Sequence, residues 1–298
     1  MRMMKKPSIG VSAEELFVLC VNTFRDEAFR NRLLGYADKV KYHAEENQKR
    51  IPADIGGFLE EILPEQVSEE DMVKVYEQKL VGGAGRYYYD QIILHAPLGR
   101  CPICGIQQAS TLDHYLPKSK VPTLAVDPGN LIPACSDCNH WKKDVLHKDP
   151  GMMPVHTYYD VIPAGKWLHA ELGPNLEAKY YIECPVGGNW EDGIRKRVTQ
   201  HLDFYHLHEK YSKETAVELA DLKNTWETEL EDLREIEGDE LPIEVLQGHF
   251  RAMIRKRRRS SERADENSYE SAFYRALEEN METAFAFFEI NGTACAAR

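Results

Sequence analysis

The sequence contains no apolar run approaching the roughly 20 residues that a membrane-spanning helix requires. The basic start MRMMKKPSIG is not followed by the apolar segment of a secretory signal. No internal repeat or low-complexity tract is evident. These absences exclude a membrane-spanning helix and predict a cytoplasmic protein, in which cysteines stay reduced and available to bind metal.

Positive charge is also scarce. The chain carries 37 lysines and arginines against 49 aspartates and glutamates, a formal net charge of −12. Neutralising phosphates supplies most of the non-specific affinity for nucleic acid, so this balance predicts weak autonomous binding to such a ligand. The charge is uneven, because residues 86–148 hold seven basic and five acidic side chains, a net +2, which leaves −14 for the remainder.

Four of the seven cysteines form two matched pairs, Cys101-x-x-Cys104 and Cys135-x-x-Cys138. Each pair can chelate one ion in a tight turn, and together they supply the four thiolates of a tetrahedral structural zinc site. Unpaired buried thiols or disulfides are the alternative, but matched pairs rarely arise without a metal. A redox Cys-x-x-Cys would use one pair and leave the other idle. The thirty residues between the pairs are more than a zinc ribbon usually holds.

That interval and the residues just after it hold three polar landmarks in order: Asp113-His114, Asn130, and Asn139-His140. With these landmarks the segment 100–144 resembles the HNH nuclease family and its ββα-metal fold. The resemblance implies a structural zinc held by the cysteines and a first strand that ends at the catalytic histidine. It also implies an asparagine in the loop behind that histidine and a metal ligand on the helix after the second cysteine pair.

The implied reaction is metal-dependent hydrolysis of DNA phosphodiester bonds, which needs a water nucleophile, a base and a cation. His114 is expected to be the base, because an ordinary imidazole is largely neutral at cytoplasmic pH. Asp113 and Asn139 are expected to hold Mg2+ or Mn2+ through hard oxygen ligands, and Asn130 to brace the loop and orient His114. Neighbours on a strand point to opposite faces, so Asp113 and His114 can meet one substrate only where the strand ends or twists.

The third landmark departs from the family pattern, because Asn139 stands where a histidine is usual and His140 follows it. An amide oxygen favours Mg2+ or Mn2+ over softer metals, although His140 can replace Asn139 as the ligand if the turn formed by the second cysteine pair is shifted. The alternative interpretations are a core histidine for His114 and turn or cap residues for Asp113 and Asn139. Four lysines cluster around the motif and are expected to contact the substrate phosphate: Lys118, Lys120, Lys142 and Lys143.

A narrower resemblance rests on the order GRYYYD, CPICG, LDHYLPKS, LAVDPGNLIPACSDCN and VHTYYD. This order is similar to that of PtuB-like HNH proteins paired with ABC- or SMC-like ATPases in Septu-type bacterial anti-phage systems. It implies an ATPase partner that restrains or loads the nuclease, with the acidic helical flanks as the docking surface. Three alternatives stay open: a stand-alone restriction or homing HNH enzyme, a non-catalytic zinc-binding adaptor, and RNA as the substrate.

The whole chain predicts an α+β protein that is mostly α. Three regions are expected, namely an N-terminal helical region (1–85), the nuclease core (86–190) and a C-terminal helical region (191–298). The pattern Ser12-x-x-Glu15 predicts a capping box. Loops are expected at 51–67 and 185–189, a strand at 179–184, and helices at 214–236, 243–259 and 268–290.

Two further segments have open roles. Residues 152–167 are aromatic and punctuated by proline, and are expected to pack back on the nuclease core. A structural role is expected for His156, and the alternative is that it reaches the active site. The run RKRRR at 255–259 ends a predicted helix. It is either a solvated helix end that interacts with its own negative pole or a contact for nucleic acid or an acidic partner.

Overall fold

The chain folds into two compact units. The structure is a computed structural model that describes residues 1–50, 67–147, 149–185, 190–238 and 240–290. Unit 1 comprises Met1–Ile162 and Glu191–Tyr205, and unit 2 comprises Pro163–Trp190 and His206–Arg298. Within the described residues, no helix is both long and apolar enough to cross a bilayer.

These units cut across the expected regions 1–85, 86–190 and 191–298. The N-terminal helices fold together with the cysteine-rich segment, and the helix at 192–204 returns to unit 1. The physical reason for this return is a buried ion pair between Arg197 and Asp160, in which the arginine also donates to the hydroxyl of Tyr115 at 2.8 Å. The expected loops at 51–67 and 185–189 lie almost wholly outside the described residues.

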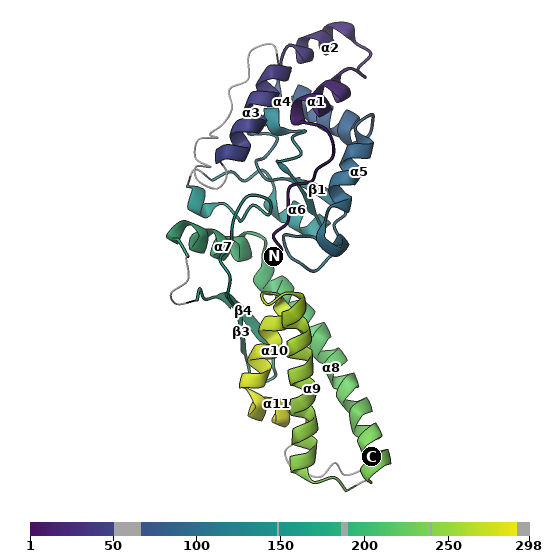
Figure 1. Ribbon diagram of the computed structural model, residues 1–298, viewed down its shortest axis with the longest axis vertical. Helices are drawn as coiled ribbons and strands as arrows, with labels where there is room; N and C mark the ends of the chain where they lie inside the picture. The colour runs from purple at the N-terminus through teal and green to yellow at the C-terminus, as the bar shows by residue number, and fades with distance from the viewer. Residues whose placement is uncertain (51–66, 148, 186–189, 239, 291–298) are drawn as a thin grey trace. The chain divides into compact units, whose positions relative to one another are not determined.

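The N-terminal part of unit 1 is a set of short helices, labelled in Figure 1. Their bounds are α1 (Ala13–Val21), α2 (Glu27–Leu34), α3 (Ala37–Arg50), α4 (Glu69–Lys74), the π-helix η2 (Val75–Val81) and α5 (Arg86–Leu94). The capping box predicted for Ser12 and Glu15 is confirmed, and Ser68 and Asp71 form a second one. Helices α3 and α4 pack on the short 3-10 helix η4 (Pro122–Leu124), so this region covers the loop of the sequence motif.

Two antiparallel strands followed directly by a helix form the centre of unit 1. They are β1 (Thr111–His114), β2 (Leu131–Ala134) and α6 (Ser136–Lys142), with Asp113 opposite Ile132 and His114 opposite Leu131. Every residue from 121 to 135 is buried. Helix α5 packs on both strands and α6 packs on β1, so the strand carrying the motif lies between helices. Two further 3-10 helices, η3 (Pro97–Gly99) and η5 (Pro150–Met152), lie in the connections.

The aromatic segment after α6 packs back on this centre, as expected. The hydroxyl of Tyr115 donates to the carbonyl of Pro154 at 2.8 Å, and that of Tyr158 donates to the carbonyl of Leu131 at 2.7 Å. His156 is fully buried among tyrosine rings, and burial holds its pKa well below the usual value. Helix α7 (Asp192–Phe204) closes unit 1 through η5 and the Arg197–Asp160 pair. This environment fits the structural role expected for His156.

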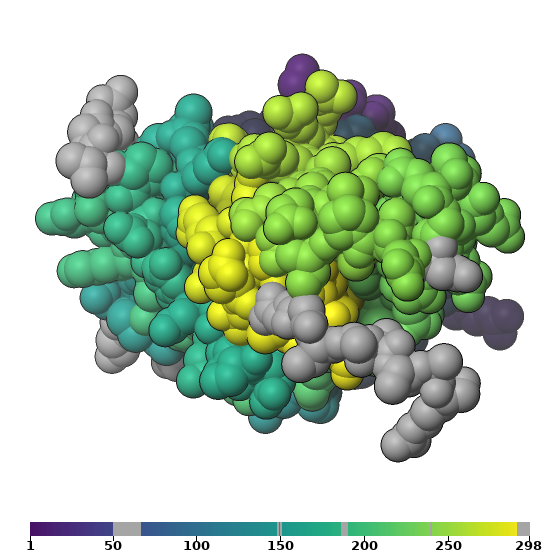
Figure 2. Space-filling view, turned by 90° about the horizontal axis from the view of Figure 1, so that it is seen from below, coloured from purple at the N-terminus to yellow at the C-terminus, as the bar shows by residue number. Residues whose placement is uncertain are grey.

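Unit 2 is a two-stranded hairpin covered by helices. Its elements are β3 (Leu168–Leu172), β4 (Ala178–Ile182), α8 (Leu207–Glu237), α9 (Ile243–Ala264), α10 (Tyr269–Glu279) and α11 (Met281–Phe287). Figure 2 shows the yellow α10 and α11 lying directly against the green surface of α9, in agreement with the packing of α10 on α9, β3 and α8. Strand β4 confirms the strand expected near residues 179–184.

Two expectations in unit 2 need correction. Strand β3, the partner of β4, was not expected, because LHAEL has only a weak alternating pattern. The single helix expected at 268–290 is divided into α10 and α11 at Asn280. The side-chain amide of Asn280 donates to the carbonyl of Ala276 at 2.8 Å while its backbone leaves the helical region, so the asparagine ends one helix before the next begins.

Candidate active site and metal centre

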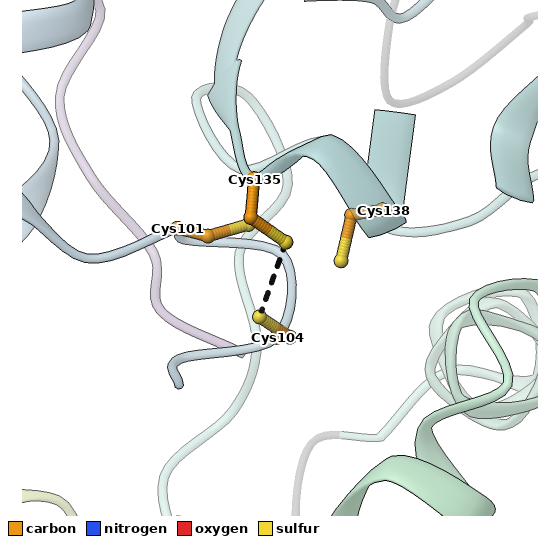
Figure 3. Close-up of side chains that lie close together, drawn as sticks. All are labelled: Cys101, Cys104, Cys135 and Cys138. Atoms are coloured by element: carbon orange, nitrogen blue, oxygen red, sulfur yellow. Dashed lines mark hydrogen bonds between the residues drawn. The ribbon is translucent and has the colours of Figure 1, made fainter. Parts of the chain in front are cut away.

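The four motif cysteines converge in unit 1. Their sulfur atoms all lie within 4.8 Å of one another and the residues are buried. Figure 3 shows Cys101 and Cys104 on the loop before β1, and Cys135 and Cys138 at the start of α6, with the sulfurs turned toward a common centre. Cys135 occupies the N-cap position of α6, so the second pair lies on the first turn of a helix.

This cluster fits a structural zinc ion. A tetrahedral site with zinc–sulfur bonds of about 2.3 Å places the sulfurs about 3.8 Å apart, and the Sγ atoms of Cys104 and Cys135 are 3.9 Å apart. Burial raises the pKa of Cys101 and the neighbouring thiols raise that of Cys138, whereas a hydrogen bond with Cys101 lowers the pKa of Cys135 to about 7. Four crowded thiolates therefore need a cation to ionise together.

The end of β1 places the proposed base and its acidic neighbour at one point in the core. Asp113 is 3% exposed and His114, the last residue of the strand, is 7% exposed. The strand terminates here, which is the condition under which both side chains can serve one substrate. Beyond it, the chain turns through Leu116 into the loop that carries η4.

The imidazole of His114 is held in one tautomer. Its Nε2 lies 2.9 Å from the carbonyl oxygen of Ala125, which can only accept a hydrogen bond. The neutral ring therefore carries its proton on Nε2 and keeps a lone pair on Nδ1. Burial lowers the pKa of His114 to about 3, and the bond to Ala125 opposes this shift. The ring is neutral at physiological pH, as a general base must be.

The ring of Tyr76 packs against His114 from the π-helix η2. The ring centroids are 4.4 Å apart with an interplanar angle of 66°, an edge-on contact, and the tyrosine is 8% exposed. The ammonium of Lys118 lies 5.4 Å from the centroid of the same tyrosine ring. Tyr76 thus contacts both the proposed base and one of the lysines expected to bind substrate.

Asp113 faces a buried lysine. Lys142, at the end of α6, is 1% exposed on its side chain, and its Nζ lies 3.7 Å from Oδ1 of Asp113 and donates to the carbonyl oxygen of His114. Burial raises the pKa of Asp113 to about 6, and the charge of Lys142 limits that rise. The other carboxylate oxygen, Oδ2, is buried without a hydrogen-bond partner among the described residues. A buried carboxylate oxygen with no described hydrogen-bond partner fits a bound divalent cation.

Asn130 braces the loop behind the site, and it does so without contacting the His114 ring directly. Its Oδ1 accepts from the backbone of Leu116 at 2.8 Å, and its Nδ2 donates to the carbonyls of Leu116 at 2.9 Å and Leu124 at 3.2 Å. Leu124 precedes Ala125, the residue that bonds the imidazole. Asn130 therefore orients His114 indirectly, by fixing the loop whose Ala125 carbonyl bonds the imidazole.

The N-terminal helices support the same loop from the other side. His43 on α3 hydrogen-bonds Thr123 within η4 at 2.7 Å. Asn47, one turn later, donates to the buried carboxylate of Asp127 at 3.4 Å. The carbonyl that fixes the His114 tautomer thus depends on residues far from the motif in sequence.

The remaining predicted site residues lie nearer the surface. Asn139 is half-buried on α6 and His140 is exposed beside it. Within the described part of the chain, no recorded contact joins the Asn139 side chain to Asp113 or His114. Lys118 and Lys120 are half-buried and Lys143 is exposed, whereas Lys142 differs from expectation because its ammonium is in the core.

Three contributors to this site were not predicted from the sequence: Tyr76, the carbonyl of Ala125 and the ammonium of Lys142 in its buried position. A backbone carbonyl leaves no trace in residue type, and Tyr76 lies 38 positions before His114 with no motif around it. For Lys142 the residue type predicts exposure, and its burial follows from the packing of α6 on β1, which no short pattern in the sequence reveals.

Comparison with known proteins identifies the same segment of the chain. Residues 101–144 match the family model "HNH endonuclease". The chain is also similar to the protein ea31 of Escherichia phage lambda, with 31% identity over 157 residues, which cover 50% of this chain and 52% of that protein. The chain thus spans about half the length of this curated relative. No solved structure matches. Residues 101–144 therefore form an HNH endonuclease-type domain with a cluster of four cysteines.

Proposed function

We propose that this chain is a metal-dependent endonuclease that hydrolyses DNA phosphodiester bonds through its HNH-type domain. The observation that carries the proposal is the pairing of two buried groups at the end of β1. His114 keeps an Nδ1 lone pair because its Nε2 bonds Ala125, and Asp113 has a carboxylate oxygen with no described hydrogen-bond partner. A base beside a hard anionic ligand serves hydrolysis, and a domain that only binds zinc needs neither.

In the proposed reaction, Nδ1 of His114 accepts a proton from water while the water oxygen attacks the scissile phosphorus and the bond to the leaving oxygen breaks. The Ala125 carbonyl holds the ring in the required tautomer throughout. The imidazolium that forms donates a stronger hydrogen bond to this carbonyl. Because burial lowers the pKa of His114 to about 3, the ring is neutral at physiological pH and its Nδ1 lone pair is available to accept the proton.

Asp113 and Asn139 are the proposed ligands of a catalytic Mg2+ or Mn2+. When bound, that ion neutralises the charge that builds on the leaving oxygen. The buried oxygen of Asp113 that has no described hydrogen-bond partner supports this assignment. His140 is the alternative second ligand, because it is the next residue on α6 and exposed. The four cysteines are the proposed ligands of a structural zinc that folds the segment carrying these residues.

The lysines divide into two proposed roles. Lys118, Lys120 and Lys143 are the proposed contacts to substrate phosphate, because they lie at or near the surface around the motif. Lys142 is instead proposed to position Asp113 and the end of β1, since its buried ammonium already contacts both. In this mechanism water is the nucleophile, so the chemistry itself permits RNA as an alternative substrate.

A partner protein is the finer part of the proposal. The net charge of −12 favours weak autonomous binding of DNA. We therefore propose that an ABC- or SMC-like ATPase restrains or loads the nuclease, as the motif order of the anti-phage systems implies. A stand-alone restriction or homing enzyme is the alternative within the nuclease class. Robust, indiscriminate digestion by the purified chain alone would count against an activating partner.

The test of the central proposal is nicking of supercoiled plasmid with Mg2+ or Mn2+, against a chelator. His114→Ala is expected to abolish nicking while the protein stays folded and keeps its zinc, although loss of the buried bond to Ala125 lowers its unfolding temperature by a few degrees. Asn139→Ala and His140→Ala are the matched pair of variants for the second ligand. Only the variant that lacks the metal ligand should lose activity. Plasmid that stays intact under every metal condition, in the presence of a correctly folded zinc-loaded protein, would favour the adaptor interpretation.

A further inference from the structure

We infer that the exposed face of helix α9 in unit 2 binds the phosphate backbone of nucleic acid through Lys256, Arg259 and Arg263. This inference rests on the proposed function, to which it adds a second contact for the same substrate. The three residues, called the α9 stripe below, are all exposed. They form no ion pair with any residue that the structure describes.

Helix α9 stands out in an acidic chain. It carries seven lysines and arginines against two glutamates, a net charge of +5, while α8 carries four basic and ten acidic side chains, a net −6. Most non-specific affinity for nucleic acid must come from positive charge that the rest of the protein does not cancel. Helix α9 is therefore the place in unit 2 where such charge is concentrated.

Four of the seven cations hold unit 2 together. Arg257 pairs with Asp221 of α8 at 3.2 Å and Arg251 with Glu282 of α11 at 3.6 Å. Arg255 pairs with Glu278 of α10 at 2.9 Å. Arg258 pairs with Glu262 at 3.1 Å and also with Glu278, at 2.6 Å. The basic run expected at 255–259 is thus partly structural, which leaves the α9 stripe as the cations without such a role.

The α9 stripe occupies one side of the helix. At about 100° per residue, its three positions fall within about 60° of one another, and the four paired arginines lie outside this arc. Like charges three and four residues apart repel by a few tenths of a kcal/mol each. No described acidic side chain offsets this cost, so the arrangement weakens the isolated helix and is explained by a ligand that neutralises it.

The dimensions and chemistry of the face favour phosphate over a protein surface. Seven residues of helix span about 10 Å, close to three nucleotide steps at about 3.4 Å each along one strand. The exposed residues around the stripe include Gly248, His249, Ala252, Arg255 and Ser260, and no large apolar side chain of α9 is exposed. Protein interfaces depend on buried aromatic or aliphatic anchors, which this face lacks.

The experiment measures binding separately from cleavage. The full chain with His114→Ala is titrated against a short fluorescent DNA duplex by anisotropy over a series of salt concentrations. The test variant adds Lys256→Gln, Arg259→Gln and Arg263→Gln. The matched control adds Lys213→Gln, Lys223→Gln and Arg234→Gln, three exposed cations on α8 with no ion pair recorded among the described residues. Both variants lose the same charge in the same unit.

Each phosphate contact contributes about 0.9 to the slope of log affinity against log salt for duplex DNA, so the test variant should lower that slope by about 2 to 3 and weaken binding at least about tenfold at low salt. The control should change affinity by less than about threefold. Poly-L-glutamate, titrated in parallel, represents an acidic protein partner. A test variant that binds the duplex as tightly as the control overturns the inference. So does a test variant that keeps its affinity for the duplex and loses affinity only for poly-L-glutamate. Absence of plasmid nicking by the parent would instead count against the proposed function and leave this result intact.

Discussion

The requirement for the catalytic cation should depend on pH through Asp113, and not through His114. Burial raises the pKa of Asp113 to about 6 and lowers that of His114 to about 3. A proton on Asp113 competes with a cation for the carboxylate, whereas His114 stays neutral throughout the range from pH 5 to 8. Lowering the pH should therefore raise the metal concentration needed for half-maximal nicking without slowing the reaction at saturating metal.

The magnitude follows from the two pKa values. Competition from the proton multiplies the apparent dissociation constant of the cation by a factor of one plus the ratio of protonated to ionised carboxylate. For a pKa of about 6, this factor is about 1.1 at pH 7 and about 11 at pH 5. The half-saturating Mg2+ concentration should thus rise about tenfold. If His114 titrated at its ordinary value near 6.5, the rate at saturating metal would instead fall about 30-fold at pH 5.

The assay is the initial rate of plasmid nicking over a matrix of Mg2+ concentration and pH, with zinc content checked at each pH. His140→Ala serves as the control for changes on α6 that leave Asp113 untouched, if Asn139 is the ligand. A half-saturating Mg2+ concentration that is independent of pH, combined with a rate at saturating metal that falls through pH 6.5, would refute the electrostatic account of this site.

Three further predictions follow from the packing of unit 1. Arg197→Met should destabilise the protein by about 3–5 kcal/mol in urea unfolding, since it leaves the Asp160 carboxylate buried without its partner; recovery is expected with Asp160→Asn added, and a loss below about 1 kcal/mol would argue against the buried pair. Tyr76→Leu should slow nicking by about ten- to a hundredfold, because His114 loses the ring that positions it. Tyr76→Phe keeps the ring and should keep the rate. Equal rates for the two variants would show that the ring of Tyr76 does not position His114. Burial lowers the pKa of His201 to about 3, so the unfolded chain binds the extra proton between about pH 6.5 and 3 and stability falls as the pH drops through that window. Between pH 7.5 and 5 the parent should lose about 2 kcal/mol that His201→Asn does not lose, as measured by the difference in their urea midpoints.

The sequence predicts the local features of this protein well, because they depend on residues close together in the chain. The four cysteines form one cluster, as the two Cys-x-x-Cys pairs predicted, and the capping box at Ser12 is present. Strand β1 ends at His114, as predicted for the Asp113-His114 pair. Each of these features follows from a short pattern whose physical meaning does not depend on the rest of the fold.

Long-range features were not predictable in the same way. The N-terminal region could not be assigned to unit 1 from residues 1–85 alone, because its contacts with the η4 loop and with His114, made by residues such as His43, Asn47 and Tyr76, join positions far apart in the sequence. Lys142 carries a charge and was expected at the surface. Its burial is compensated by Asp113 and the His114 carbonyl, which become neighbours once α6 packs on β1.

The most direct test of the account is to locate the catalytic cation itself. In crystals of the full chain grown with Mn2+, anomalous scattering collected at the manganese and zinc edges distinguishes the two metals. We expect zinc among the four cysteine sulfurs and a separate manganese ion bound by Oδ2 of Asp113, with Asn139 as its second protein ligand. Zinc in the cysteine cluster together with an Asp113 that binds no ion, at manganese concentrations that support nicking, would contradict the proposed catalytic site.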